Sequence, residues 1–267
     1  MTIAQAILLG IIQGLTEFIP VSSTAHLLIG QQLLGLPSSD LMFAFLVIIQ
    51  LGTVASLIVF FWQDLWGIVR ATIDLRHSTP NRNLGINLIV ATIPAALIGY
   101  LLRHAVEDLF NAPVLEAAIR LFAAAILLAA AEYFGKRSRG LDSLTWLDAL
   151  VIGLFQLIAV FPGASRSAAT IGGGMLRGFD RPAAARFAFL MSVPILLGAG
   201  GYQALDVLDL PGLGDFIPAI TVGFVTAAIF GWLSVRWLMS YLGRHSLYVF
   251  AGYCAVVGLV VFLVSRL

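Results

Sequence analysis

The chain has 267 residues, of which 60% are hydrophobic and only 11% are charged. A soluble domain carries about 25% charged residues, so this composition excludes a soluble globular fold and makes membrane lipids the expected surroundings. The net charge of +1 gives no reason to expect nucleic acid as a partner.

The first predicted element, residues 3–34, is apolar but interrupted near its middle. Pro20 and the polar run Ser22, Ser23 and Thr24 divide it into two half-length helices. Non-helical backbone at membrane depth is tolerated only where it is buried in protein or lines a wet cavity. We therefore predict a re-entrant hairpin here rather than a membrane span.

Three spans are predicted next, at residues 41–63, 84–102 and 114–134, each with about the 20 residues that a crossing helix needs. Residues 147–176 are interrupted by Pro162, Gly163 and the run Ser165–Ser167, which predicts a second re-entrant hairpin. Three further spans are predicted at 182–202, 216–237 and 246–264. The predicted fold class is an all-α polytopic membrane protein with six transmembrane helices and two re-entrant helical hairpins.

Basic residues are concentrated in alternate loops of this layout. The loops after the first and third spans hold Arg70, Arg76, Arg82, Lys136, Arg137 and Arg139. Because such loops face the cytoplasm, both chain termini are expected outside. The first hairpin would then enter from outside and the second from the cytoplasm.

The two hairpins also resemble each other in sequence. The segment Gly10-Ile-Ile-Gln13 aligns with Gly153-Leu-Phe-Gln156, and Phe18 aligns with Phe161 at the same offset. This predicts a duplicated unit of one hairpin and three spans. Since three is odd, the second copy must be inverted in the membrane. The expectation is one membrane domain, 1–267, with repeat 1 at 1–140 and repeat 2 at 141–267.

Charged and polar residues at membrane depth are costly, so their positions indicate function. Gln13 and Glu17 lie four residues apart and share one helix face. His26 lies one turn beyond Ser22 and Ser23. The second hairpin supplies Arg166, whose polar or glycine neighbours are Gly163, Ser165, Ser167 and Thr170.

These residue types suit phosphoryl transfer. A helix start offers free N–H groups to an anion, and the guanidinium of Arg166 matches phosphate oxygens. The expected substrate-binding residues are Gln13, Ser22, Thr24, Gly163, Ser165, Ser167 and Thr170. Ser23 would attack, His26 would move the proton, and Glu17 would orient His26 or hold a divalent metal cation. Helix capping by Ser22 and a purely structural pairing of Glu17 with Arg166 remain the structural alternatives.

The two polar motifs are also recognisable. The stretch Gln13-Gly-Leu-Thr-Glu17-Phe-Ile-Pro-Val-Ser-Ser-Thr-Ala-His26 closely resembles the first signature of the undecaprenyl-diphosphate phosphatase family, also called the bacitracin-resistance family. The stretch Pro162-Gly-Ala-Ser-Arg-Ser-Ala-Ala-Thr170 resembles its second signature. The likeness extends over the whole chain in length, hydropathy and duplicated layout.

The resemblance implies a bacterial inner-membrane enzyme that converts undecaprenyl diphosphate to undecaprenyl phosphate and inorganic phosphate. That reaction recycles the lipid carrier of peptidoglycan synthesis, and because bacitracin binds the diphosphate form, an excess of enzyme confers resistance. By position, the resemblance assigns catalytic roles to Glu17, Ser23, His26 and Arg166 and places the cavity on the periplasmic face. It also implies Mg²⁺ or Ca²⁺, although Gln13, where the family allows Glu or Gln, weakens a two-carboxylate metal site.

The main alternative is a membrane transporter or flippase of a lipid phosphate or another anion, since inverted repeats and broken helices are common in transporters. Transport needs the anion cradle but neither a nucleophile nor a base. Ser23 and His26 facing Arg166 therefore favour the enzyme. The sequence leaves a homodimer open as a further partner.

Overall fold

The computed structural model describes residues 1–74, 79–101, 113–158, 165–207 and 210–264. These residues form eleven α-helices and one short 3-10 helix. The first half contains α1 (Ile3–Phe18), α2 (Ser23–Leu33), α3 (Asp40–Phe60), α4 (Trp62–Ile73), α5 (Pro80–Leu101) and α7 (Pro113–Phe134). The second half contains η1 (Leu141–Ser143), α8 (Trp146–Ile158), α9 (Arg166–Leu176), α10 (Arg181–Val207), α11 (Leu213–Leu242) and α12 (Tyr248–Val264).

Five helices are long and apolar enough to cross a membrane, namely α3, α5, α7, α10 and α11. They coincide with five of the six predicted spans. The sixth, α12, is apolar throughout but has 17 described residues, fewer than the other five. Many large apolar side chains on these helices are exposed, such as Val59, Ile126 and Val256, as expected where lipid is the solvent. The protein is therefore an all-helical polytopic membrane protein.

The first predicted span extends too far at its C-terminal end. Phe61 leaves the helical conformation, so α3 ends at Phe60 and a separate helix, α4, begins at Trp62. Arg70 lies over the ring of Trp66, 4.6 Å from its centroid. An amphipathic helix with Trp and Arg side chains suits the membrane interface. Hydropathy alone did not separate the two helices because the apolar run continues through residues 60–62.

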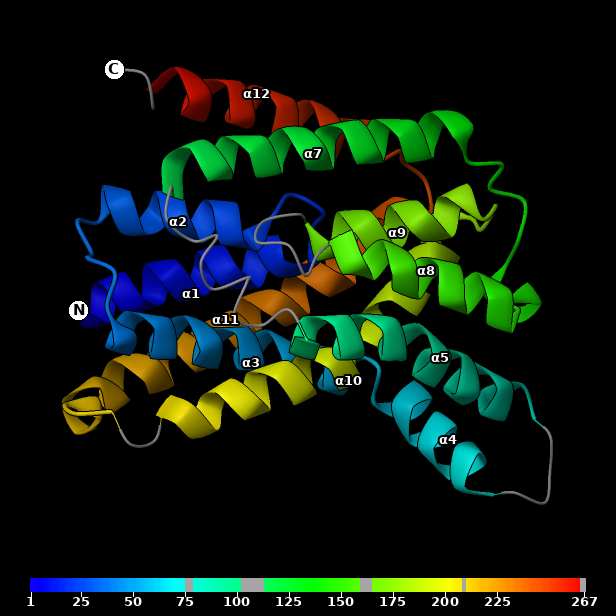
Figure 1. Cartoon of the computed structure of the whole chain (residues 1–267), viewed down its shortest axis with the longest axis horizontal. Coiled ribbons are helices and arrows are strands. Elements are labelled where there is room, and N and C mark those ends of the chain that lie inside the picture. Colours follow the sequence, from blue (N-terminus) through cyan, green and yellow to red (C-terminus); the bar gives the residue numbers. More distant parts are fainter. Residues whose placement is uncertain (75–78, 102–112, 159–164, 208–209, 265–267) are drawn as a thin grey trace.

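Each predicted hairpin is a pair of half-length helices. In Figure 1, α1 and α2 lie in the half of the molecule near the N-terminus, and α8 and α9 lie in the other half. Pro20 explains the end of α1, because a residue before proline favours extended backbone and Ile19 has φ −62° and ψ 130°. In the second hairpin, residues 159–164 lie outside the described part of the chain.

The paired segments correspond residue by residue. The shift in numbering that aligns Gly10 with Gly153 also carries both ends of α2, Ser23–Leu33, onto both ends of α9, Arg166–Leu176. The N-caps correspond as well: Ser22 accepts the amide N–H of Ala25, and Ser165 accepts that of Ala168. The packing is also reciprocal, because α5 and α11 occupy corresponding places in the two halves. The first helix of one half packs chiefly against the corresponding helix of the other: α1 against α11, and α8 against α5.

Glycine permits the close crossings in this arrangement. A Cβ atom added at Gly10 would collide with the carbonyl oxygen of Gly223 on α11. One added at Gly153 would collide with the carbonyl oxygen of Ala91 on α5. Small residues let membrane helices approach backbone to backbone, which explains why both hairpins carry glycine at this equivalent position.

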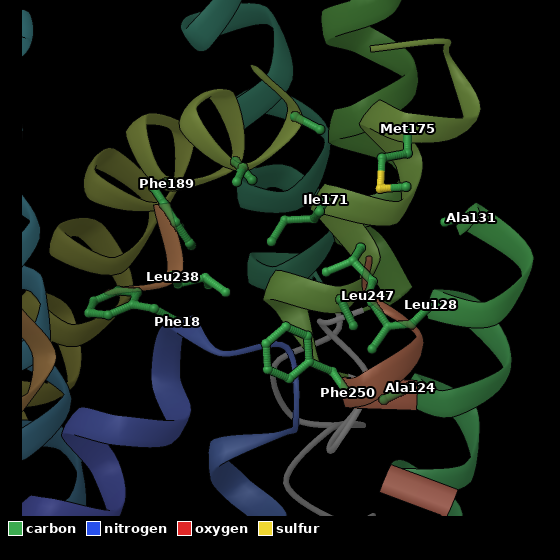
Figure 2. Packing of buried hydrophobic residues seen from close by; sticks show 14 of the residues in the cluster. Phe18, Ala124, Leu128, Ala131, Ile171, Met175, Phe189, Leu238, Leu247 and Phe250 are labelled. Carbon is green, nitrogen blue, oxygen red and sulfur yellow. The ribbon is translucent and has the colours of Figure 1, made fainter. Parts of the chain in front are cut away.

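An apolar core joins the end of α1 to the second half of the chain (Figure 2). Phe18 is 1% exposed and meets Phe189 of α10 edge to face, with ring centroids 5.6 Å apart. Leu238 of α11 and Ile171 of α9 belong to the same buried cluster. This packing holds the last turn of α1, and therefore the polar break that follows it, beside α9.

A buried carboxylate joins three helices at one end of the molecule. Glu132 of α7 accepts hydrogen bonds from Arg181 Nε at 2.6 Å and Nη2 at 2.7 Å, and from Arg137 Nη1 at 2.6 Å. The backbone N–H of Leu247 donates a fourth bond at 2.6 Å. The side chain of Glu132 is fully buried. One acid thus joins the end of α7 to the starts of α10 and α12.

We expect Glu132→Gln to destabilise the protein by about 3 kcal/mol, because two guanidinium groups would lose their counter-charge in a buried setting. The measurement is the unfolding free energy or unfolding temperature of the purified protein in detergent. Asp64→Asn is the matched control, since the Asp64–Arg186 pair is partly exposed and should cost less than about 1 kcal/mol. Equal losses of stability in Glu132→Gln and Asp64→Asn would contradict the stabilising role assigned to Glu132.

A second buried carboxylate lies at the start of α8. Asp148 is 1% exposed and accepts from Arg139 Nη2 at 2.6 Å and Arg177 Nε at 2.8 Å. The hydrogen bonds to Asp148 raise the pKa of the Arg139 guanidinium, so that cation stays charged. Asp148 therefore joins the linker between the two halves to the end of α9.

Candidate active site

The break between α1 and α2 has an unusual backbone. Ser22 is held at φ 67°, a left-handed conformation that costs a non-glycine residue on the order of 1 kcal/mol. Its hydroxyl accepts the N–H of Ala25 and caps α2. Its carbonyl oxygen lies 2.9 Å from Nδ1 of His26. The strained residue thus starts α2 and orients the histidine one turn later.

Glu17 is the centre of the polar cluster. Its Oε2 atom accepts from Ser23 Oγ at 2.7 Å and from Gln13 Nε2 at 3.0 Å. Its Oε1 atom forms an ion pair with Nη2 of Arg166. The carboxylate is nearly buried, at 4% side-chain exposure, and the Arg166 side chain is 15% exposed. Residues from the two hairpins, far apart in sequence, therefore meet at one carboxylate.

Arg166 occupies the first position of α9, immediately after the capping residue Ser165. The Ser165 and Ser167 hydroxyl oxygens lie 3.2 Å apart, and both residues are buried. Nε of Arg166 is buried and has no hydrogen-bond acceptor among the described residues. A helix N-terminus, two hydroxyl groups and a guanidinium with a spare donor together suit an anion with several oxygens.

Two of the predicted binding residues lie less directly at this cluster. The Thr170 hydroxyl donates to the carbonyl oxygen of Arg166 at 2.9 Å and is fully buried, so it supports the first turn of α9. Thr24 is exposed, and within the described chain no hydrogen bond joins it to Glu17 or Arg166. Gly163 lies outside the described residues.

His26 is oriented differently from the sequence-based prediction. Its Nδ1 atom contacts the Ser22 carbonyl oxygen, and its Nε2 atom lies 2.9 Å from the hydroxyl of Tyr253. Both ring nitrogens are thereby occupied, and no hydrogen bond joins His26 to Glu17 in the described part of the protein. Glu17 does not orient His26 here, because its carboxylate already serves Ser23, Gln13 and Arg166.

Tyr253 is the contact that sequence reasoning missed. It lies on α12, and its neighbour Cys254 is buried with the thiol 3.8 Å from the carbonyl oxygen of Pro20. The sequence feature that could have indicated a contact here is a tyrosine within an apolar helix, because a Tyr hydroxyl away from water needs a polar partner. The sequence did not indicate that this partner would be His26.

The described residues do not fit a resident metal cation. They contain no group of three or more His, Cys, Asp or Glu side chains arranged to hold one. Glu17 is the only carboxylate in the polar cluster as described, and hydrogen bonds and an ion pair engage both its oxygens. A Mg²⁺ or Ca²⁺ ion held by protein side chains alone would need more oxygen ligands than this, whereas Mg²⁺ is commonly bound by one or two carboxylates together with substrate phosphate oxygens and water.

Comparison with known proteins finds relatives over nearly the whole chain. The model of the family described as bacitracin resistance protein BacA matches residues 6–260. A protein of Anaeromyxobacter sp. (strain K), called undecaprenyl-diphosphatase, is 43% identical over 257 residues, which cover 94% of this chain and 87% of the relative. One of the same name from Chloroherpeton thalassium is 40% identical over 280 residues, covering 100% of this chain and 97% of the relative.

Matches of this length extend from α1 into α12 and include both hairpins and the helices that support them. The resemblance first seen in the Glu17 and Arg166 motifs is therefore confirmed across the chain, which belongs to the bacitracin resistance protein BacA family.

Proposed function

We propose that this protein hydrolyses undecaprenyl diphosphate to undecaprenyl phosphate and inorganic phosphate in the bacterial inner membrane. The observation that carries the proposal is Glu17, which accepts a hydrogen bond from Ser23 and pairs with Arg166. A potential nucleophile, its proton acceptor and a phosphate-binding cation thus lie in contact. The reaction regenerates the lipid carrier for peptidoglycan synthesis and removes the form that bacitracin binds.

In the first step, the terminal phosphate binds Arg166 and the N-terminus of α9. Ser23 Oγ attacks the terminal phosphorus and its proton passes to Glu17, which already accepts it at 2.7 Å. The bond from that phosphorus to the bridging oxygen breaks, and undecaprenyl phosphate leaves. Arg166 stabilises the charge that spreads over the phosphoryl oxygens, the main requirement of such a transition state.

In the second step, water attacks the phosphoserine, giving inorganic phosphate and restoring the Ser23 hydroxyl. His26 is the nearby group suited to take the proton of that water, because its neutral ring carries a basic nitrogen. Glu17 returns the proton it received from Ser23. Gln13 holds the Glu17 carboxylate in place with a hydrogen bond of 3.0 Å.

The test is phosphate release by the purified protein in detergent, with a long-chain polyprenyl diphosphate as substrate. We expect one inorganic phosphate and one polyprenyl monophosphate for each diphosphate consumed. Substrate binding with no phosphate release would favour the transporter or flippase instead. The contact between Ser23 and Glu17 supports the hydrolase, because transport has no need of an activated hydroxyl.

The proposal includes no step through a resident metal ion, because the protein ligands are too few. A cation such as Mg²⁺ or Ca²⁺ would find Glu17 as its one carboxylate among the described site residues. Protein that retains one equivalent of either cation through gel filtration in chelator would contradict this interpretation. Running the phosphate-release assay with and without chelator measures any requirement of the reaction itself.

We expect Glu17→Gln to lower kcat about 100-fold, the typical contribution of a positioned proton acceptor. The amide keeps the size of the side chain and can still contact Ser23, but it cannot take the proton. KM should not rise, because Arg166 would be released from its counter-charge and remain available to phosphate. The kinetic constants are measured from phosphate release.

Asp64→Asn is the control for that substitution, since it removes a partly exposed carboxylate that pairs with Arg186. It should leave kcat and KM unchanged. Full activity in Glu17→Gln would remove Glu17 from the mechanism.

We also propose the finer architecture of six spans, two re-entrant hairpins and an inverted repeat, with repeat 1 at 1–140 and repeat 2 at 141–267. The matching ends and caps of α2 and α9 support the duplication. The exchange of partners, α1 with α11 and α8 with α5, supports a two-fold relation between the copies. An odd number of spans in each copy requires that the copies be inverted.

The proposed orientation places the chain termini on the periplasmic side, and the family resemblance implies that the catalytic cavity opens to that side. Its support is the clustering of basic residues around Glu132 and Asp148, where Arg137, Arg139, Arg177 and Arg181 come together. Such clusters favour the cytoplasmic side. The N-terminus and the last described turn of α12 lie toward the opposite end of the molecule in Figure 1.

A further inference from the structure

His26 is held by two contacts of different kinds. Its Nδ1 atom lies 2.9 Å from the backbone carbonyl oxygen of Ser22, and its Nε2 atom lies 2.9 Å from the hydroxyl of Tyr253. A carbonyl oxygen only accepts hydrogen bonds, so Nδ1 must carry the hydrogen. In the neutral ring Nε2 is then the basic nitrogen, and the Tyr253 hydroxyl donates to it.

Tyr253 reaches His26 from the other half of the chain. The imidazole and phenol rings are nearly parallel, with 9° between their planes and 5.7 Å between centroids. The next residue, Cys254, is fully buried and contacts the carbonyl oxygen of Pro20. α12 therefore meets the break of the first hairpin at two successive residues, which fixes the phenol relative to His26.

We propose that Tyr253 is a positioning residue for His26 in the hydrolase reaction proposed above, on which this inference rests. It orients the ring by donating its hydroxyl hydrogen to Nε2, and the proton of the attacking water reaches that nitrogen through the phenol oxygen, which gives its own hydrogen to Nε2 and takes one from the water in exchange. A base oriented by a third group is a recurring arrangement in nucleophilic catalysis. Ser22 and Tyr253 together orient the His26 ring, which is one of the two roles that the sequence suggested for Glu17.

The arrangement also makes each half of the chain necessary to the chemistry of the other. The proton acceptor Glu17 of the first half is paired by Arg166 of the second. The base His26 of the first half is oriented by Tyr253 of the second. Neither half would hold a complete site by itself, so the active site depends on how α2, α9 and α12 are brought together by packing against α7.

Tyr253→Phe tests the proposal because it removes only the hydroxyl. We expect kcat for phosphate release to fall between about tenfold and 100-fold, as for a misplaced catalytic group, with KM unchanged. Tyr248→Phe is the matched control: Tyr248 lies on the same helix and is 47% exposed, compared with 45% for Tyr253. Equal kcat values for Tyr253→Phe and the wild type would overturn the proposal.

A double-mutant cycle separates positioning from a general effect on packing. If Tyr253 acts through His26, adding Tyr253→Phe to His26→Ala should cost no further activity. A further loss as large as that in the wild-type background would show that Tyr253 acts independently of His26, and would overturn the proposal.

A third measurement does not depend on activity. Diethyl pyrocarbonate modifies free imidazole nitrogens, and mass spectrometry of peptides from the labelled full-length protein distinguishes His26 from the other three histidines. We expect His26 to react several-fold faster in Tyr253→Phe than in wild type or Tyr248→Phe. Unchanged labelling would refute the contact even in an active enzyme. Wild-type protein that releases no phosphate would instead refute the proposed function, while the labelling still reports on Tyr253.

Discussion

Arg166→Ala should lower the rate of phosphate release by at least about 1000-fold, which is the lower end of what a charge-stabilising arginine contributes in phosphoryl transfer. The guanidinium already lies at the first turn of α9 with its Nε donor unused among the described residues. Its removal takes away the positive charge nearest to the expected phosphate. It also leaves the Glu17 carboxylate without its counter-charge in a nearly buried place.

Arg166→Lys distinguishes charge from shape. Lysine keeps the positive charge but cannot offer the two-pronged donor geometry of arginine, so we expect only partial recovery of the rate. Arg186→Ala is the control, because Arg186 forms a partly exposed pair with Asp64 and should leave turnover unchanged. Near-normal turnover by Arg166→Ala would mean that another group binds the phosphate.

Ser23→Ala should likewise lower kcat at least about 1000-fold, because removing a nucleophile costs as much as removing the whole catalytic unit. The substitution deletes one hydroxyl from the first residue of α2, whereas the N-cap is Ser22, so the helix should still begin at the same place. The readouts are steady-state phosphate release and the detection of phosphoserine at position 23 after rapid quenching.

The control for Ser23→Ala is Thr24→Val, which removes a hydroxyl at the next, exposed position. It should retain most of the activity, because no hydrogen bond joins Thr24 to Glu17 within the described residues. Near-normal rates in Ser23→Ala, without a phosphorylated intermediate in the wild type, would identify water as the attacking group. Glu17 would then activate that water instead of Ser23.

Much of the fold was accessible from local sequence. Five of the predicted spans correspond to helices long and apolar enough to cross a membrane, because runs of about 20 apolar residues have few other stable structures. Pro20 and the Ser22 run marked the first break correctly, since proline and capping residues act on their immediate neighbours. The α3–α4 junction at Phe61 was missed because it leaves no polar mark in the sequence.

The candidate site was only partly accessible in the same way. The motifs named Glu17, Ser23, His26 and Arg166, and the structure brings Glu17, Ser23 and Arg166 into direct contact. Glu17 was predicted either to orient His26 or to hold a metal cation, but the partners of His26 are Ser22 and Tyr253. A carboxylate has limited room for donors; Gln13 and Ser23 contact Glu17 from within the first hairpin, and the position of α9 adds Arg166.

The sequence by itself determined the membrane environment, the broken hairpins and the residue types available for phosphate chemistry, because hydropathy, proline and helix capping act over a few residues. Only the tertiary structure decided that Arg166 pairs with Glu17 and that Tyr253 contacts His26. Those contacts join residues up to 227 positions apart. Such pairs depend on how α2, α9 and α12 all pack against α7, which local preferences do not specify.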